Sequence, residues 1–187
     1  MDRWPTRDEA QALLDEWTKN VNLKKHACAV EAAMRAYAGR FGQDAHAWGI
    51  VGLLHDFDYE RYPDARDHPF RGAECLRARG WPEELAQAVF AHAEHTGAPR
   101  NTLLEKALFA VDELTGLIVA VALVRPTKRL ADVSVESVLK KWDDRRFAAG
   151  VSRRVIEQGA GELGVPLEEH IGVVLTAMQG IVDRLGL

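Results

Sequence analysis

Apolar residues recur along most of the chain at the three- and four-residue spacing of amphipathic helices, and no segment has the alternating pattern of a strand. Two capping boxes, Thr6–Glu9 and Thr102–Glu105, mark helix starts. The second one begins the most apolar helix of the chain, which Arg125-Pro126 closes. The pattern predicts an all-α protein.

Four further helices are predicted between these two capping boxes. Their signals are capping side chains at the start and glycine or proline near the end. The predicted helices run from a cap at Asn22 to about Arg40, from a cap at Asp44 through His55, from Asp67-His68-Pro69 to Gly80, and from Pro82 through His92 and His95.

The C-terminal part, Ser134 to Leu187, predicts two or three amphipathic helices with breaks near Gly150 and Gly164–Pro166. The last of them has an apolar face that either packs on the core or forms a homodimer. The pattern does not choose between these alternatives. The face consists of Ile171, Val174, Leu175, Met178, Ile181 and Val182.

Composition narrows the class of protein. A net charge of -4 gives no electrostatic basis for binding a nucleic-acid polymer. The longest apolar stretch, Ala107 to Val124, is interrupted by charged residues and predicts no membrane span. The first five residues lack the apolar core of a signal peptide, so we expect a cytoplasmic protein. Two cysteines, Cys28 and Cys75, make no disulfide framework and are expected to be buried thiols.

The strongest chemical signals are two acidic positions in apolar surroundings. The apolar run Val51–Leu54 leads directly into the doublet His55-Asp56, and Asp112 lies in the middle of the most apolar helix. A buried carboxylate is costly unless it is paired, so each should have a partner. A divalent metal is one such partner, since imidazole and carboxylate are both good ligands. For Asp112 an arginine or a helix N-terminus is the alternative.

Six more histidines need an assignment, apart from that doublet. His26 should point toward the apolar face of its helix. His92 and His95 are three residues apart, which on a helix gives one shared face, although a solvated helix end is the alternative. His68 precedes a proline at a helix start, where a cap or a surface position is the ordinary role. His46 fits no ligand pattern and is assigned, like His170, to the surface or to core packing.

Taken in order, these residues resemble the HD superfamily of metal-dependent phosphohydrolases. The diagnostic set is an early histidine, a His-Asp doublet ending a later helix, and a distant aspartate, which here are His26, His55-Asp56 and Asp112. The segment His68–Ala73 is similar to the His-x-x-x-Gly-Ala element of the HDIG-type branch. The resemblance covers about residues 20 to 125. It implies one domain over residues 1–187, with an HD core of about five helices and a helical extension from about residue 134 to 187.

The resemblance also implies a metal centre and a reaction. One or two divalent transition metals (Mn, Fe, Co, Ni or Zn) would activate water against a nucleotide or another small phosphate ester. Asp56 and His55 would be catalytic, with Asp56 orienting or deprotonating the water. Arg71 and Lys106, as well as Arg100 and Lys25, are the candidate cations for the substrate phosphate. The implied ligands are His26, His55, Asp56, His68, His92, His95 and Asp112.

Departures from the family pattern leave alternatives open. Phe57–Glu60 stands where some relatives have Gly and Lys, and the Gly-Tyr-Pro element of cyclic-di-GMP phosphodiesterases is absent from the sequence. The additional histidines also suit a di-iron oxygenase with the same fold. A binding module that uses the fold as a scaffold is the third hypothesis.

Overall fold

The computed structural model describes residues 3–187, and these residues form helices and no strand. The first two residues, which begin the segment predicted not to be a signal peptide, lie outside the described part. The helical structure of residues 3–187 confirms the predicted all-α class. The helices are α1 Arg7–Trp17, α2 Val21–Phe41, α3 Ala45–Leu54, α4 Phe70–Ala78, α5 Glu83–Ala91, α6 Leu103–Leu123, α7 Val135–Leu139, α8 Arg153–Leu163, α9 Leu167–Gln179 and α10 Val182–Leu185, with short 3-10 turns at Glu94–Thr96 and Leu130–Asp132.

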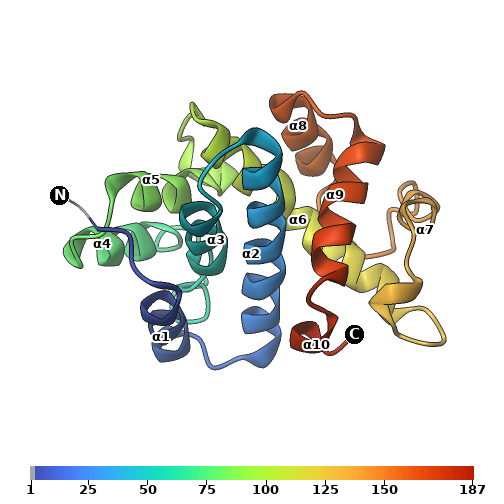
Figure 1. Ribbon diagram of the computed structural model, residues 1–187, viewed down its shortest axis with the longest axis horizontal. Helices are drawn as coiled ribbons and strands as arrows, with labels where there is room; N and C mark the ends of the chain where they lie inside the picture. The colour runs from blue at the N-terminus through green and yellow to red at the C-terminus, as the bar shows by residue number, and fades with distance from the viewer. Residues whose placement is uncertain (1–2) are drawn as a thin grey trace.

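The two longest helices, α2 and α6, are the centre of the molecule. In Figure 1, α3, α4 and α5 lie on one side of α2, α8 and α9 lie on the other, and α6 passes behind. Both predicted capping boxes are present, at Thr6 and Thr102. The predicted cap of α2 was wrong: Asn20, and not Asn22, accepts the backbone N–H bonds at its start. Asparagine two residues earlier satisfies the same free N–H groups.

Helices α2 and α3 cross at very short distance because Gly52 has no side chain. A Cβ atom at Gly52 would lie 2.8 Å from the backbone oxygen of Val30. The close crossing places the end of α3, where His55 follows, directly beside the first half of α2, where His26 lies. The backbone contact therefore sets the distance between these two histidines.

The C-terminal stretch forms four helices, α7 to α10, and not the two or three predicted, although the breaks near residues 150 and 164–166 are present. Two of the four are only five and four residues long, which is too short for a periodic pattern to show. Helix α9 packs on α2 and α6 (Figure 1). This face packs within the chain, because four of its six predicted residues are buried in the core and the other two, Ile181 and Val182, are half-buried against it. The buried four are Ile171, Val174, Leu175 and Met178.

His170 ties α9 to both central helices. Its Nε2–H donates to the backbone oxygen of Ala110 at 2.9 Å, and its Nδ1 accepts from the Tyr37 hydroxyl. The ring is fully buried. Sequence analysis offered surface or core for His170, and the structure shows a core histidine with both nitrogens paired. Burial lowers the pKa of His170 to about 4.

His170 should make the fold sensitive to acid. Its pKa is below the ordinary value of about 6.5, so between pH 6.5 and pH 4 the unfolded chain binds the proton and the folded chain does not. The free energy of unfolding therefore keeps its full value above pH 6.5. It falls by about 3 kcal/mol as the pH drops through this window. We expect denaturant titrations at pH 7.5 and 4.5 to show a smaller loss for His170→Gln than for the wild type. The exposed His46→Gln should lose as much as the wild type, and an unchanged profile for His170→Gln would refute the assignment.

The structure also bears on the predictions about a membrane span and about the two cysteines. In the part of the chain that the structure describes, no helix is long and apolar enough to cross a membrane. Cys28 and Cys75 are both free thiols, but each is half-buried and not fully buried as expected.

Candidate metal centre

The His55-Asp56 doublet lies where α3 ends. His55 is the C-terminal cap of the helix and is fully buried, and its Nδ1 donates to the backbone oxygen of Gly52 at 2.8 Å. This bond turns the other ring nitrogen, Nε2, away from the helix and toward α2 and α6. The apolar run before the doublet is buried throughout, and it carries His55 into the interior as the sequence predicted, whereas Asp56 is half-buried at the edge of the core.

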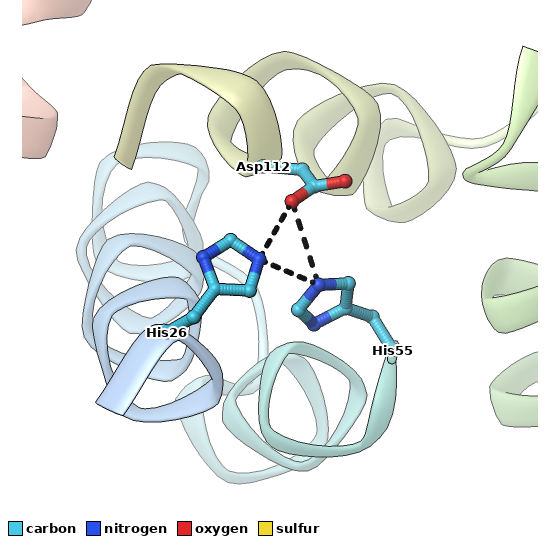
Figure 2. Close-up of side chains that lie close together, drawn as sticks. All are labelled: His26, His55 and Asp112. Carbon is cyan, nitrogen blue, oxygen red and sulfur yellow. Dashed lines mark hydrogen bonds and ion pairs between the residues drawn. The ribbon is translucent and has the colours of Figure 1, made fainter. Parts of the chain in front are cut away.

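Three residues from α2, α3 and α6 converge on one point, as Figure 2 shows. The Nε2 atoms of His26 and His55 are 3.2 Å apart. Oδ1 of Asp112 is 3.0 Å from Nε2 of His26 and 3.4 Å from Nε2 of His55. We call these three residues the first cluster. Its donor atoms face one another closely enough to hold one metal ion.

A second cluster lies beside the first and contains Asp56, His68 and His92. Oδ1 of Asp56 is 3.2 Å from Nε2 of His68 and 3.2 Å from Nε2 of His92. The other oxygen, Oδ2, is 3.7 Å from Nε2 of His55 in the first cluster. The Asp56 carboxylate thus stands between the two clusters, with one oxygen toward each.

All four histidines of the clusters present Nε2 because each Nδ1 has its own partner. A carbonyl or carboxylate oxygen accepts only, so a bond from Nδ1 to such an oxygen fixes the proton there. The hydroxyl of Thr115 donates to the backbone oxygen of Asp112, so it is free to accept from His26. Such outer partners are typical of metal-binding histidines. The partners are Thr115 Oγ1 for His26, Gly52 O for His55, Asp58 Oδ1 for His68 and Val89 O for His92.

The electrostatics of the clusters also favour a cation. Burial raises the pKa of Asp56, but the charge of His55 and hydrogen bonds from His68 and His92 outweigh it and hold the pKa well below its usual range. Burial lowers the pKa of His68, but hydrogen bonds with Asp56 and Asp58 raise it to about 9. The ionised carboxylates therefore favour the protonated, positively charged form of the neighbouring imidazoles. A divalent metal supplies that charge instead and displaces the protons.

The donor set fits a metal. Imidazole nitrogen and carboxylate oxygen together suit Mn, Fe, Co, Ni and Zn, and both clusters combine these two donor types. Each histidine already has the outer hydrogen bond that fixes its orientation. The residues present are thus those that a transition-metal site requires.

The clusters open into a pocket of about 370 Å³. Four carboxylates line it, and no lysine or arginine does so among residues 3–187. Burial raises the pKa of one of them, Glu113. Phe109 and Val155 provide apolar wall. The complete lining is Asp56, Tyr59, His68, His92, Ala93, Glu94, His95, Phe109, Asp112, Glu113 and Val155.

Six of the seven predicted ligands take part in the two clusters, and His95 does not. The helix expected to carry both His92 and His95 ends at Ala91, and His95 lies in the following 3-10 turn. The two therefore share no helix face, and that prediction was wrong. His95 borders the pocket, but its Nε2 is 2.8 Å from the backbone oxygen of His68, to which it can only donate.

None of the four candidate cations lines this pocket. Arg71 forms exposed ion pairs with Asp67 and Glu74, and Lys106 lies on α6 outside the lining. Arg100 pairs with Glu162 from α8, and Lys25 lines a different pocket that His26 also borders. Arg100 is the one of these four whose guanidinium lies over a pocket residue, 3.6 Å from the ring centroid of Phe109.

Sequence reasoning missed Asp58 and Thr115 as supports of the clusters. Asp58 is fully buried and accepts from the Gly72 backbone N–H at 2.8 Å as well as from His68. The segment Phe57–Glu60 was seen only as a departure from the family pattern. The signal was the aspartate two residues after the doublet together with the Gly72-Ala73 pair, since a Cβ at Gly72 would meet the Asp58 carboxylate at 2.9 Å.

Comparison with known proteins places the chain in a family. The model of the HD domain family matches residues 23–117, about half of the chain, and the chain therefore belongs to this family. HD domains are in general metal-dependent phosphohydrolases that bind divalent metals. A search of curated proteins and a search of solved structures each found no match.

Proposed function

We propose that the chain hydrolyses a small phosphate ester, such as a nucleotide, with two divalent transition metals. The observation that carries the proposal is the pair of clusters with Asp56 between them, in which all four histidines direct Nε2 toward the carboxylate of Asp56 or Asp112. His26, His55 and Asp112 would hold one ion, His68 and His92 the other, and Asp56 both. Bound there, the ions supply Lewis acidity and lower the pKa of water toward neutrality.

The residues of the chain then have distinct tasks. Asp56 is the carboxylate that stands between the two clusters, so it orients the attacking water. Asp58 holds His68 through Nδ1, and the backbone of α3 holds His55, which keeps both rings fixed during turnover. Tyr59 and Phe109 line the pocket and exclude bulk water from one side. The carboxylates of Glu94 and Glu113 repel an anion, so the substrate phosphate relies on the ions for its binding.

The size of the pocket limits the kind of substrate. A pocket of about 370 Å³ suits a small phosphorylated compound and not a nucleic-acid polymer. With a net charge of -4, the protein has no electrostatic basis for a polymer partner. We propose a cytoplasmic enzyme whose partner is its small substrate.

The test is phosphate release from a panel of nucleotides and sugar phosphates by protein purified without chelator. We expect hydrolysis of at least one compound, its loss after EDTA, and its return with Mn²⁺, Co²⁺ or Ni²⁺ added back. Iron in the protein with oxygen uptake and no phosphate release would favour the di-iron oxygenase. No turnover and no bound metal would favour the scaffold hypothesis.

A further inference from the structure

A recess of about 350 Å³ lies in the C-terminal extension, beyond the part of the chain that matches the HD family. Its charge is opposite to that of the metal pocket. Three arginines and two carboxylates line the recess, whereas four carboxylates and no arginine or lysine among the described residues line the pocket. The recess is lined by Trp142, Asp143, Arg145, Arg153, Arg154 and Glu157.

The recess adjoins the metal pocket at the first turn of α8. Arg154 lines the recess and the next residue, Val155, lines the pocket. The Arg154 guanidinium reaches across to Glu94 on the pocket rim, at 2.9 and 2.6 Å from the two carboxylate oxygens. Both side chains are largely exposed, so a competing anion from solvent can reach the arginine. Arg154 is thus the cation that stands between the two cavities.

Helix α8 is fixed firmly enough to define a binding surface. A Cβ at Gly159 would lie 2.5 Å from the Cα atom of Ala110, so α8 lies directly on α6. Ser152, the cap of α8, donates its N–H to the Glu113 carboxylate at 3.2 Å. These contacts keep Arg154 and Val155 at a constant position relative to Asp112.

Two arginines of the recess, Arg153 and Arg145, differ in their partners and exposure. Arg153 is buried and its two terminal nitrogens donate to backbone oxygens, including Phe147 O at 2.6 Å and Ala148 O at 2.8 Å. Within residues 3–187, its Nε has no hydrogen-bond partner. Arg145 is exposed, and no described acidic side chain pairs with it. Guanidinium groups of this kind bind phosphate oxygens with charge-assisted hydrogen bonds.

We infer that the recess binds a second phosphate group of the substrate, while the phosphate to be hydrolysed lies at Asp56. Arg154 exchanges its Glu94 partner for this second phosphate, and Arg145 contacts it from the exposed side. The inference rests on the proposed function and narrows it to compounds that carry two separate phosphate groups. Arg154 and Arg145 are then binding residues that determine specificity.

The test uses ligands that cannot be hydrolysed, so that it does not depend on turnover. Alkane bisphosphonates with two to six methylene groups are compared with alkyl monophosphonates of equal length, by calorimetry on the Mn²⁺-loaded protein. The variants are Arg154→Gln, Arg145→Gln and Glu94→Gln. Arg146→Gln is the matched control, because Arg146 is exposed and adjacent but lines neither cavity.

We expect the best bisphosphonate to bind about tenfold more tightly than its monophosphonate, the effect of one charge-assisted contact. Arg154→Gln and Arg145→Gln should remove this preference, whereas Arg146→Gln should keep it. Glu94→Gln should increase the preference for the bisphosphonate, because it releases Arg154 from its ion pair. If Glu94→Gln instead lost the preference as Arg154→Gln does, the ion pair would have a structural role and the inference would fail. Equal affinity for both ligand classes, or an equal loss in Arg146→Gln, would overturn the inference. An intact preference in a protein without phosphatase activity would count against the proposed function alone.

Discussion

Replacing Asp56 with alanine is expected to abolish hydrolysis and to weaken both metal sites together. Asp56 has one carboxylate oxygen toward each cluster, at 3.2 Å from Nε2 of His68 and His92 and at 3.7 Å from Nε2 of His55. Removing it would take away a ligand from both ions and the group that orients the attacking water. Metal-based stabilisation is worth several kcal/mol, so we expect a fall in kcat/KM of about 10³-fold or more.

A matched control separates this effect from the loss of an acidic residue in general. Asp67 lies in the same loop, but it is half-buried and forms a surface ion pair with Arg71, which is worth little. Asp67→Ala should keep wild-type kcat/KM and metal content. Steady-state kinetics and elemental analysis of both variants check the prediction. Turnover within tenfold of wild type in Asp56→Ala would remove Asp56 from the mechanism.

Gly52→Ala should strongly destabilise the fold. The added methyl would lie 2.8 Å from Val30 O and 2.9 Å from Glu31 N, which are backbone atoms that cannot turn aside. Helices α2 and α3 must therefore separate. Overpacking of this kind costs about 3 kcal/mol, which corresponds to a fall in Tm of roughly 6 to 12 °C for a domain of this size. Because Gly52 O also accepts from His55, the first cluster should widen and bind metal less tightly.

The control for this substitution is in the neighbouring helix. Gly39 lies in α2, and a Cβ atom there would meet nothing within 4 Å. Gly39→Ala should raise stability by about 0.5–1 kcal/mol, because alanine is the better helix former. Thermal unfolding of both variants, with and without Mn²⁺, measures the two effects. Equal Tm values for Gly52→Ala and the wild type would mean that the helix crossing is not as close as described.

The sequence carried enough information for the helical class and for most of the ligand pattern. Both capping boxes and the buried setting of Asp112 follow from short-range rules, because a helix start and an apolar helix face are local properties. The doublet could be placed at a helix end because an apolar run led into it. These residues were informative because burying a charged group in such surroundings requires a partner.

The remaining features depend on how distant segments meet, which local patterns do not encode. His95 was grouped with His92 because the helix was taken to continue, whereas it ends at Ala91. The role of Asp58 needs the α4 backbone at Gly72 to lie above it, and no periodicity reveals that contact. Arg154 lies about sixty positions from Glu94, so their pairing became visible only once α8 was placed against α6.

The most direct test of the two-cluster centre is the metal content of protein purified without chelator, measured by elemental analysis for the wild type, His26→Ala and His92→Ala. Each variant removes one histidine from one cluster only. We expect two transition-metal ions per wild-type chain and about one in each variant. A wild-type protein that holds no metal after reconstitution with Mn²⁺, Co²⁺ or Ni²⁺, or variants that keep both ions, would contradict the assignment of a metal centre to these residues.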